Sequence, residues 1–447
     1  MKERLVVLGG GESGVGAAIL GKDKGLEVFL SDFGYLSAQY KKTLEDEGIE
    51  FEEGQHSEEK ILNATKVVKS PGIPPTVPIV EKIVERGIPV LSEIEFAALY
   101  TDAKMVCITG SNGKTTTTLL TYHILKKAGM NVGLAGNVGK SLALQVSRDP
   151  HEIYVIELSS FQLENMYKFK ANIAVILNIT PDHLDRYDHK MENYAAAKFR
   201  ILQNQTKDDY FIYWQDDPMI REQIIKVQGE ALKLPFGIHK EEDSSAYVDN
   251  GIVRFSTPMD VWEIPRDKLS LPGTHNLYNS MAAGLSASVL NIKKESIKAA
   301  LEDFEAVEHR LEYVDTVDGV RYVNDSKATN VNSTWYALES MTTPVVLILG
   351  GKDKGNDYSE IQELVKNKVR GIVAMGVHNE KIIDFFRDKV EEIRDTHSLE
   401  EALKACQDLA KEGDTVLLSP CCASFDLFNS YEDRGHQFKI AVKKLKS

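Results

Sequence analysis

TGSNGKTTTT, Thr109 to Thr118, lies between the apolar run MVCI and the stretch LLTYHILKK. A strand, a glycine turn, Lys-Thr and a helix in this order are typical of a phosphate-binding loop. The usual loop reads GxxxxGK[ST], but Ile108 stands where its first glycine is expected, five residues before Gly113. The loop is therefore two residues short. A plain helix cap is the alternative, and it explains fewer of these features.

The shortened loop keeps every group that a nucleotide triphosphate needs. Backbone N–H groups between Gly110 and Gly113 can point at phosphate oxygens, and Lys114 can reach the terminal phosphates. The Thr115 hydroxyl can bind Mg²⁺. The nucleotide-binding residues expected here are Gly110, Asn112, Gly113, Lys114, Thr115 and Thr116.

Short β-branched runs, each followed by a Gly or Asp turn and a helical stretch, recur on both sides of this loop. Examples are LVVLGGG, LEVFLSD, YVIELSS, AVILNIT and VVLILGGKDKG. This alternation predicts an α/β fold with sheets wound on both faces. A chain of 447 residues is long for one core, and we expect three domains, each on a mainly parallel sheet with Rossmann-like or P-loop-type topology. Boundaries near 95–101 and 305–308 give domains 1–95, 96–306 and 307–447.

Composition restricts the class of partner. The net charge of −14 argues against nucleic acid, so an anionic ligand must be held by local lysines and helix amino termini. No apolar run approaches the roughly 20 residues of a membrane helix, and the start MKERLVVLGGGESG does not resemble a signal peptide. We expect a cytoplasmic monomer without membrane insertion. Its four cysteines have no metal spacing and are expected to be reduced and buried: Cys107, Cys406, Cys421 and Cys422.

The amino-terminal segment contains a second glycine motif. Gly9, Gly11 and Gly14 satisfy GxGxxG between a strand and a helix, and Asp32 ends the next strand, where an acid can accept from a ribose hydroxyl. The motif suits NAD, but any nucleotide diphosphate can use the same turn, and the glycines could also serve packing alone. The segment SPGIPP, from Ser70 to Pro75, follows a third strand and is placed to line the same crevice.

Further polar groups follow the strands of the middle segment. Glu157 closes YVIEL beside the P-loop, where a carboxylate is well placed to bind Mg²⁺ rather than to be a solvated strand end. His183 lies in the turn NITPDHLDRY, and its neighbours favour a ligand role. Lys198 lies in KMENYAAAKFRIL, where it could extend to solvent or point into the site. A helical lysine is normally a surface residue, so spacing alone gives it no special role.

Together these segments resemble the Mur ligase family of cell-wall amino-acid ligases over the whole chain, and most closely its branch that adds D-glutamate. The segments that carry the resemblance are TGSNGKTT, AGNVG (135–139), ELSSFQL (157–163), NITPDHLDRY, YAAAKFRI, GTHNLYN (273–279), EHR (308–310), NDSKATN (324–330), GGKDKG (350–355) and SPCCASFDLF (419–428). The short P-loop is typical of this family and its folate-polyglutamate relatives, and NDSKATN distinguishes the branch.

For the central segment, the resemblance implies an ATP site with two Mg²⁺ ions. Lys114 and Thr115 would hold the β- and γ-phosphates and the first ion, with Glu157 as its protein ligand. His183 would bind a second ion, supported by Lys198 after carbamylation by CO₂. Further nucleotide contacts are implied for Asn276, Asn279, Arg310 and Asp325. Asn276 and Asn279 are three apart, hence on one helix face.

For the other segments, the resemblance implies the remaining substrates. The glycine loop would hold the diphosphate of UDP-N-acetylmuramoyl-L-alanine instead of NAD. The UDP-sugar residues implied are Gly11, Glu12, Ser13, Asp32, Phe33, Ser70, Pro71, Gly72, Asn137 and Ser159. D-Glutamate would be bound by Thr329, Lys352, Ser424 and Phe425, with Lys327 as a nearby cation. Lys327 and Lys352 complete the implied catalytic set. The three domains would then bind UDP-sugar, ATP and amino acid, respectively.

The implied reaction is ATP-dependent formation of an amide bond through an acyl phosphate. Such phosphoryl transfer needs positioning and charge neutralisation more than covalent help. Two alternatives stay open at this point: another amino-acid ligase of the same family, and a nucleotide-binding switch, which would leave Lys327 and Lys352 without a role. Residue type and spacing do not distinguish D- from L-glutamate.

Overall fold

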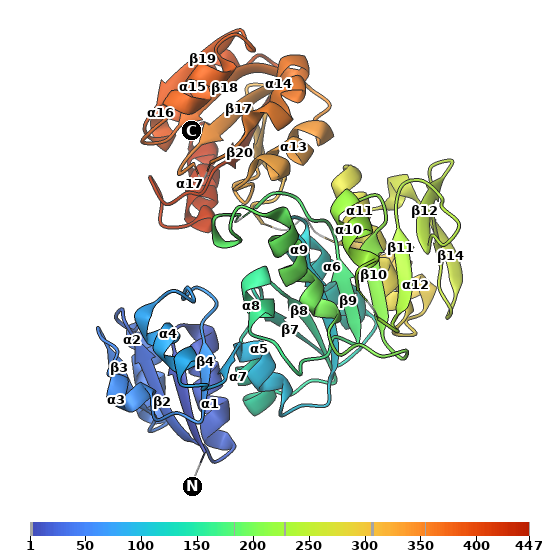
Figure 1. Cartoon of the computed structure of the whole chain (residues 1–447). Coiled ribbons are helices and arrows are strands. Elements are labelled where there is room, and N and C mark those ends of the chain that lie inside the picture. Colours follow the sequence, from blue (N-terminus) through green and yellow to red (C-terminus); the bar gives the residue numbers. More distant parts are fainter. Residues whose placement is uncertain (1–2, 183, 228, 305–307, 354, 447) are drawn as a thin grey trace. The chain divides into compact units, whose positions relative to one another are not determined.

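The computed structural model describes residues 3–182, 184–227, 229–304, 308–353 and 355–446. Their strands form three sheets with helices on their faces, as the alternating pattern predicts (Figure 1). The predicted α/β class with mainly parallel sheets is confirmed. Among the described residues, no helix combines the length and the apolar character needed to cross a membrane.

The first sheet is entirely parallel, with the strand order β3-β2-β1-β4-β5. Its strands are β1 (Arg4–Leu8), β2 (Glu27–Asp32), β3 (Glu50–Glu53), β4 (Lys66–Lys69) and β5 (Val90–Leu91). Its helices are α1 (Glu12–Asp23), α2 (Ala38–Asp46), α3 (Glu58–Ile61) and α4 (Pro78–Glu85). Because all strands run in one direction, their carboxyl ends meet at one edge, where the glycine loop and the segment after β4 lie.

The second sheet has the order β14-β13-β12-β11-β10-β9-β6-β8-β7. It is parallel except that β13 pairs antiparallel with both β12 and β14. Its strands are β6 (Lys104–Thr109), β7 (Val132–Gly136), β8 (Ile153–Glu157), β9 (Ile173–Ile176), β10 (Tyr210–Trp214), β11 (Leu232–Phe236), β12 (Ala246–Asp249), β13 (Ile252–Ser256) and β14 (Val261–Pro265). The P-loop strand β6 pairs with β8 and β9, so both neighbours deliver their carboxyl ends beside the loop.

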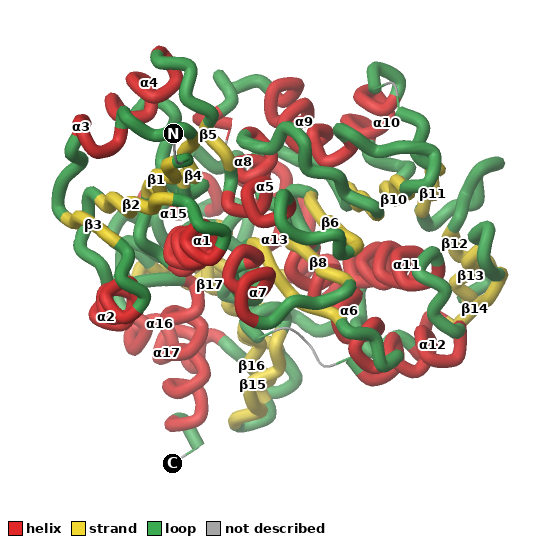
Figure 2. The backbone as a smooth tube through the Cα atoms, turned by 90° about the horizontal axis from the view of Figure 1, so that it is seen from below, coloured by secondary structure: helices red, strands yellow, loops and turns green. Residues whose placement is uncertain are grey.

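Helices and short 3-10 turns accompany this sheet. They are α5 (Glu93–Ala98), α6 (Lys114–Lys127), α7 (Leu142–Arg148), α8 (Ser160–Glu164), η1 (Leu184–Arg186), α9 (Met191–Phe199), η2 (Arg200–Leu202), α10 (Pro218–Ile224), η3 (Arg266–Lys268), α11 (Thr274–Ser288) and α12 (Lys294–Asp303). Helix α1 of the first sheet packs against α7, and Figure 2 shows the two side by side. One hydrophobic cluster runs from Leu5 through Phe96 to Ile156, so the first two sheets share a core.

The third sheet has the order β15-β16-β20-β17-β18-β19, parallel apart from the β15–β16 hairpin. Its strands are β15 (Glu312–Val317), β16 (Val320–Asn324), β17 (Val345–Gly350), β18 (Val369–Met375), β19 (Glu392–Thr396) and β20 (Thr415–Cys421). Its helices are α13 (Val331–Ser340), η4 (Tyr358–Ile361), α14 (Gln362–Lys368), α15 (Glu380–Phe386), α16 (Leu399–Leu409) and α17 (Tyr431–Lys444). Helices on both faces bury its central strands.

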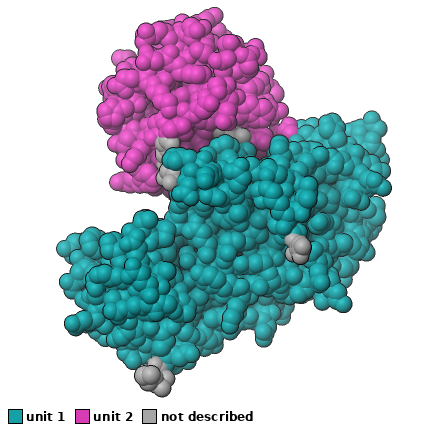
Figure 3. All heavy atoms as spheres, viewed as in Figure 1, with its two compact units in different colours: residues 1–269, 278–303 teal, residues 270–277, 304–447 magenta. Residues whose placement is uncertain are grey.

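The chain divides into two compact units, coloured separately in Figure 3. Residues 1–269 and 278–303 form unit 1, which contains the first two sheets, and residues 270–277 and 304–447 form unit 2. The predicted boundary near 95–101 falls on α5 and the turn after it, before β6 begins. The domain limits at 95 and 306 stay predictions.

Candidate active site

The P-loop is a tight turn between β6 and α6 that the neighbouring segment 177–180 supports. Gly113 has a φ of 82°, which disfavours other residues, and a Cβ there would lie 2.4 Å from the Asn279 side-chain oxygen. The backbone N–H of Asn112 donates to Asn178 Oδ1 at 2.8 Å, and that of Ser111 donates to the Asn178 carbonyl at 2.9 Å. These bonds hold the loop in a fixed conformation against the segment 177–180.

Lys114 folds back over this loop, as a P-loop lysine can before phosphate binds. Its Nζ donates to the carbonyls of Gly110 at 2.9 Å and Ser111 at 2.8 Å. Thr115 and Thr116 are buried in the first turn of α6. Asn279, a predicted nucleotide contact on α11, accepts from the Thr117 hydroxyl of α6 at 3.1 Å. Asn279 therefore lies beside the helix that follows the P-loop.

A cavity of about 220 Å³ opens next to the loop and brings together residues that the sequence places far apart. Lys114 and Lys198 line it with Asn137 and Ser159, two residues predicted to face the acyl acceptor. Pro71 and Gly72, from the loop after β4, complete one wall. The full lining is Pro71, Gly72, Lys114, Asn137, Ser159, Ser160, Phe161, Asp182, Tyr194 and Lys198.

Lys198 is an interior residue, only 1% exposed. Its Nζ donates to the Gly110 carbonyl at 2.8 Å, the same oxygen that accepts from Lys114. Burial lowers the pKa of Lys198 well below its usual value and the charge of Lys114 lowers it further, while Asp182 and Glu157 oppose the shift. The side chain therefore points into the site, which spacing on the helix did not decide.

Glu157 ends β8 beside the P-loop and offers a carboxylate oxygen for a cation. The side chain is buried, and its Oε2 has no hydrogen-bond partner among the described residues. Its backbone carbonyl accepts from the N–H of Asn137 at 3.0 Å, which holds the AGNVG turn in place. An unpartnered buried oxygen at the end of the strand that pairs with the P-loop strand β6 fits a Mg²⁺ site. His183, the other predicted metal ligand, lies outside the described residues.

A larger cavity, about 740 Å³, lies at the carboxyl edge of the first sheet. Gly11, Asp32, Phe33 and Ser70 line it as predicted, and Gly72 borders both cavities. The remaining lining residues are Gly9, Gly10, His56, Glu58, Ile73, Pro74, Val77, Pro78 and Ile79. Phe33 is 73% exposed and therefore able to contact a ligand.

Two predicted residues of this region, Asp32 and Glu12, have contacts that the motif did not reveal. Both carboxylate oxygens of Asp32 accept backbone N–H groups, from Gly10 at 2.5 Å and from Gly34 at 2.7 Å. Asp32 therefore shapes the glycine loop. Glu12 accepts from the N–H of Ser141 at 3.2 Å, and neither Glu12 nor Ser13 lines either cavity.

In unit 2, the predicted nucleotide residues are Asn276, Arg310 and the buried Asp325. Asp325 accepts from Ser419 Oγ at 2.8 Å and from the N–H of Leu311 at 3.2 Å. Burial raises the pKa of Asp325 to about 6, against the opposing charge of Arg310. The Nε of Arg310 is buried with no partner among the described residues. Asn276, at the start of α11, donates to the Pro272 carbonyl at 2.8 Å.

The predicted D-glutamate residues lie at the carboxyl ends of β16, β17 and β20. The N–H of Lys352 donates to the Ala423 carbonyl at 2.8 Å, which joins GGKDKG to the segment carrying Ser424 and Phe425. Ser424 is buried, whereas Lys352 is exposed. Thr329 donates its N–H to the Lys327 carbonyl at 2.9 Å, and the Lys327 ammonium lies 5.3 Å from the Tyr431 ring centre.

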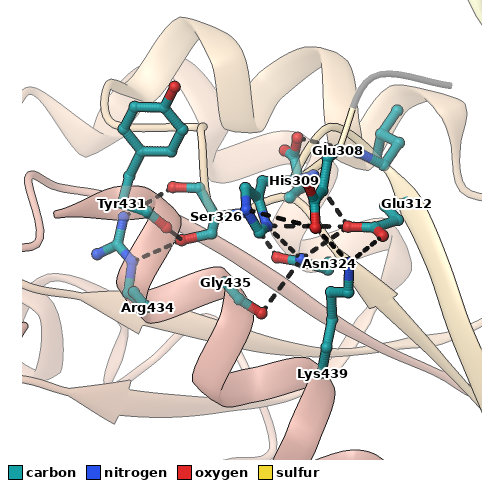
Figure 4. Close-up of polar contacts among 11 residues, drawn as sticks. Glu308, His309, Glu312, Asn324, Ser326, Tyr431, Arg434, Gly435 and Lys439 are labelled. Carbon is teal, nitrogen blue, oxygen red and sulfur yellow. Dashed lines mark hydrogen bonds and ion pairs between the residues drawn. The ribbon is translucent and has the colours of Figure 1, made fainter.

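Helix α17 fixes the segment NDSKATN. Arg434, almost fully buried, donates to the Ser326 hydroxyl at 2.9 Å and the Ser326 carbonyl at 2.8 Å (Figure 4). Asn324 donates to the Gly435 carbonyl at 3.4 Å. The segment therefore sits in a fixed place at the end of β16.

Glu308, His309 and Glu312 place their ligand atoms within 4.8 Å of one another, as in a metal site. Lys439 donates to Glu308 at 2.6 Å and to Glu312 at 2.7 Å, so an ammonium already pairs with both carboxylates (Figure 4). His309 Nδ1 accepts from Asn324 at 2.9 Å. The group is an internal ion cluster that anchors the start of β15.

Four lining residues of the small cavity had no role in the sequence interpretation: Ser160, Phe161, Asp182 and Tyr194. Each lies inside a quoted motif, ELSSFQL, NITPDHLDRY or YAAAKFRI, so position after a strand end was the available signal. Lys69, the last residue of β4, was also missed. It is 2% exposed and carries a charge next to the loop that borders both cavities.

The fold and site define a P-loop nucleotide-binding enzyme in which the phosphate loop faces a cavity shared with a second glycine-loop domain. Three family models match successive parts of the chain. The Mur ligase middle domain matches residues 108–287, the Mur ligase glutamate ligase domain 309–422, and the MurD N-terminal domain 4–79.

Known proteins agree over the full length. The chain is 59% identical to the UDP-N-acetylmuramoylalanine–D-glutamate ligase of Bacteroides fragilis, with 99% of this chain and 100% of the relative covered. It is 55% identical to the corresponding ligase of Porphyromonas gingivalis, covering 100% and 99%. The structure of UDP-N-acetylmuramate-alanine ligase from Thermotoga maritima aligns with a TM-score of 0.62 at 17% identity, covering 99% and 100%. The chain belongs to the Mur ligase family, and it is an ATP-dependent ligase that forms amide bonds.

Proposed function

We propose that this ligase joins D-glutamate to UDP-N-acetylmuramoyl-L-alanine in the cytoplasmic synthesis of peptidoglycan precursors. Relatives with this name cover the whole chain at 59% and 55% identity. The observation that carries the proposal is the small cavity, which joins the P-loop lysine to Asn137, Ser159 and the loop of the first domain. A UDP-sugar in the large cavity could direct its acyl end past Gly72 to the P-loop.

The reaction begins with attack of the substrate carboxylate on the γ-phosphorus of ATP. One P–O bond forms and the bond to ADP breaks, leaving an acyl phosphate. The D-glutamate amine then attacks the acyl carbon, and phosphate leaves from the tetrahedral intermediate as the amine loses a proton. Lys114, released from the loop carbonyls, would follow the transferred phosphoryl group, and the N–H groups of the loop would hold its oxygens.

Mg²⁺ would neutralise the phosphate charge during transfer. We assign Thr115 and Glu157 to one ion, and His183 with Lys198 to a second. Lys198 suits this role after carbamylation, in which its neutral amine adds to the carbon of CO₂ and releases a proton. The resulting carbamate supplies the negative charge that a lysine lacks.

Unit 2 would bind the amine substrate and make the remaining contacts with the nucleotide. We assign Asn276, Arg310 and Asp325 to the nucleotide together with Asn279 of unit 1, and Thr329, Lys352, Ser424 and Phe425 to D-glutamate. Lys327 would add positive charge near the amino-acid carboxylates. We expect the enzyme to act as a monomer.

A substrate panel tests the proposal. Purified enzyme receives ATP, Mg²⁺ and UDP-N-acetylmuramoyl-L-alanine with one amino acid at a time: D-glutamate, L-glutamate, L-alanine, L-lysine or meso-diaminopimelate. Phosphate release and mass spectrometry of the product should identify D-glutamate as the preferred substrate. Preference for another amino acid would indicate a different ligase of the family, and turnover independent of the UDP-sugar would contradict the proposal.

A further inference from the structure

The large cavity presents a charge problem for a nucleotide diphosphate. Among the described residues, its lining includes the carboxylates of Asp32 and Glu58 and the His56 ring, but no lysine or arginine. Glu58 forms an ion pair with Lys82, which uses that positive charge, and Asp32 is held by backbone N–H groups. Burial lowers the pKa of His56, so this ring is neutral near pH 7. A diphosphate here needs a cation from behind the wall.

Lys69 provides one. Its side chain leaves the end of β4 and is buried beneath the loop after it. Its Nζ donates to the Ile73 carbonyl at 2.7 Å and to the Ser70 carbonyl at 3.2 Å, and both residues line the large cavity. The ammonium therefore lies directly behind residues that line the cavity. Its hydrogen bonds also hold the loop that borders both cavities.

The surroundings of Lys69 leave its charge uncompensated. Its hydrogen bonds go to backbone carbonyls only, and no carboxylate pairs with it among the described residues. The nearby Glu164 is engaged by Arg186 at 2.9 Å and by the Tyr187 hydroxyl at 2.6 Å. Burial and then Arg186 lower the pKa of Lys69 to about 8, which Glu164 opposes. A buried cation without a counterion is costly unless an anion approaches it.

We propose that Lys69 is a positioning residue for the substrate diphosphate, acting through the field of its buried ammonium and through its hold on the loop 70–73. The inference rests on the proposed function, because it requires a UDP-sugar in the large cavity. The positive charge that acts on the diphosphate would come from Lys69, behind the cavity wall. Lys114 and Lys198 lie elsewhere, at the reacting end of the substrate. Across a few ångström of partly polar protein, such a charge contributes enough to change affinity about tenfold.

The test compares UDP with uridine, two probes that differ only in the diphosphate. Calorimetric dissociation constants are measured with the full-length wild type and with Lys69→Met. The variant should bind UDP about tenfold more weakly while its affinity for uridine stays within about twofold. Lys69→Arg should recover most of the UDP affinity. Lys66→Met, at the other end of β4, is the matched control, because it removes an equal charge that is paired with Glu3. It should bind both probes normally.

Equal weakening of UDP and uridine would show that Lys69 only supports the loop, and unchanged binding of UDP would show that it has no role. Either result overturns the inference. If Lys69→Met does not fold, Lys69→Gln provides the same comparison with a polar side chain. Wild-type turnover with D-glutamate is measured separately. Its failure would count against the proposed function, whereas a charge effect confined to UDP would still support Lys69 as a positioning residue for the diphosphate.

Discussion

Lys114 and Lys198 share the Gly110 carbonyl, although two ammonium groups at one oxygen would repel each other. The conflict is resolved if one amine is neutral, and burial selects Lys198, whose pKa lies well below its usual value. A neutral amine is nucleophilic toward CO₂. The buried position of Lys198 thus favours its carbamylation, which the proposed binding of a second Mg²⁺ ion requires.

Lys198→Ala should therefore reduce ligation by roughly 100-fold or more, as removal of a group supporting a metal site does. Far-UV circular dichroism and the affinity for UDP should stay close to those of the wild type. A short carboxylic acid at high concentration should restore part of the activity by occupying the vacated space. Lys190→Ala, an exposed lysine before the same helix, is the control. Near-normal turnover of Lys198→Ala would contradict the assignment of the second ion.

Glu157→Gln probes the first ion. The unpartnered buried Oε2 destabilises the protein in the absence of metal, so the variant should unfold at an equal or higher temperature without ligands. With MgATP the order should reverse, because the wild type gains the stabilisation of metal binding and the variant loses about 1–3 kcal/mol of it. Thermal scans with and without MgATP measure both. Glu152→Gln, at the exposed start of β8, should behave as wild type. Equal stabilisation of Glu157→Gln by MgATP would exclude Glu157 as the ligand.

Sequence reasoning at this scale found the residues whose chemistry shows in a local motif, such as Lys114 and Glu157. It did not place Lys198 in the site or identify Lys69, because the burial of a lysine depends on segments far away in the chain. Lys198 contacts a loop 88 residues earlier. For Asp32 the motif predicted a ligand contact but did not reveal that its oxygens also accept the N–H groups of Gly10 and Gly34.

At the scale of elements, α5 joins the first two sheets through two buried carboxylates. Glu93 accepts from the Ser141 hydroxyl at 2.7 Å and the Ala143 N–H at 2.6 Å, at the start of α7. Glu95 accepts from three consecutive N–H groups, of residues 167–169. Because α5 also packs against α1 and β4 of the first sheet, it connects the glycine-loop domain to the P-loop domain.

Glu93 gives this connection a dependence on pH. Burial raises the pKa of Glu93 from 4.5 to about 7, so the folded protein binds more protons than the unfolded chain between these values. Its contribution to stability is thus full below pH 4.5 and is lost as pH rises through 7.

Glu93→Gln should remove this pH-dependent contribution to stability. Relative to the variant, the wild type should lose up to about 3 kcal/mol of unfolding free energy from pH 4.5 to pH 8. Urea titrations across this range measure it, with the exposed Glu85→Gln as control. A difference between wild type and Glu93→Gln that does not vary with pH would contradict the argument.

The strands that sequence patterns predicted are those with continuous β-branched runs, and such runs form the buried centres of all three sheets. The strands β13 and β14, at one end of the second sheet, were not anticipated. Their residues alternate between buried and exposed, with burial patterns in which every second side chain meets solvent. Alternation of this kind indicates a half-buried strand, but over five residues it does not decide which strand the segment pairs with, because the sheet that it extends decides that.

At the scale of the whole molecule, the proposed reaction is distributed over two compact units. Unit 1 contains the P-loop and both cavities, whereas the predicted D-glutamate residues belong to unit 2. This division implies that formation of the acyl phosphate does not require the amino acid, and the two half-reactions should be separable.

Phe425→Ala should separate them. Phe425 is 67% exposed, so its removal should not weaken the fold, and its predicted contact is with D-glutamate alone. With ATP, Mg²⁺ and UDP-N-acetylmuramoyl-L-alanine but no D-glutamate, hydroxylamine should trap the acyl phosphate as a hydroxamate at similar rates in wild type and variant. The variant should then show a KM for D-glutamate raised about tenfold, the effect of losing one well-packed aromatic contact. Tyr313→Ala, which removes another exposed ring of unit 2, should leave both half-reactions unchanged. Absence of any hydroxamate from the wild type, under conditions where ligation proceeds, would instead indicate that phosphoryl transfer waits for the amine.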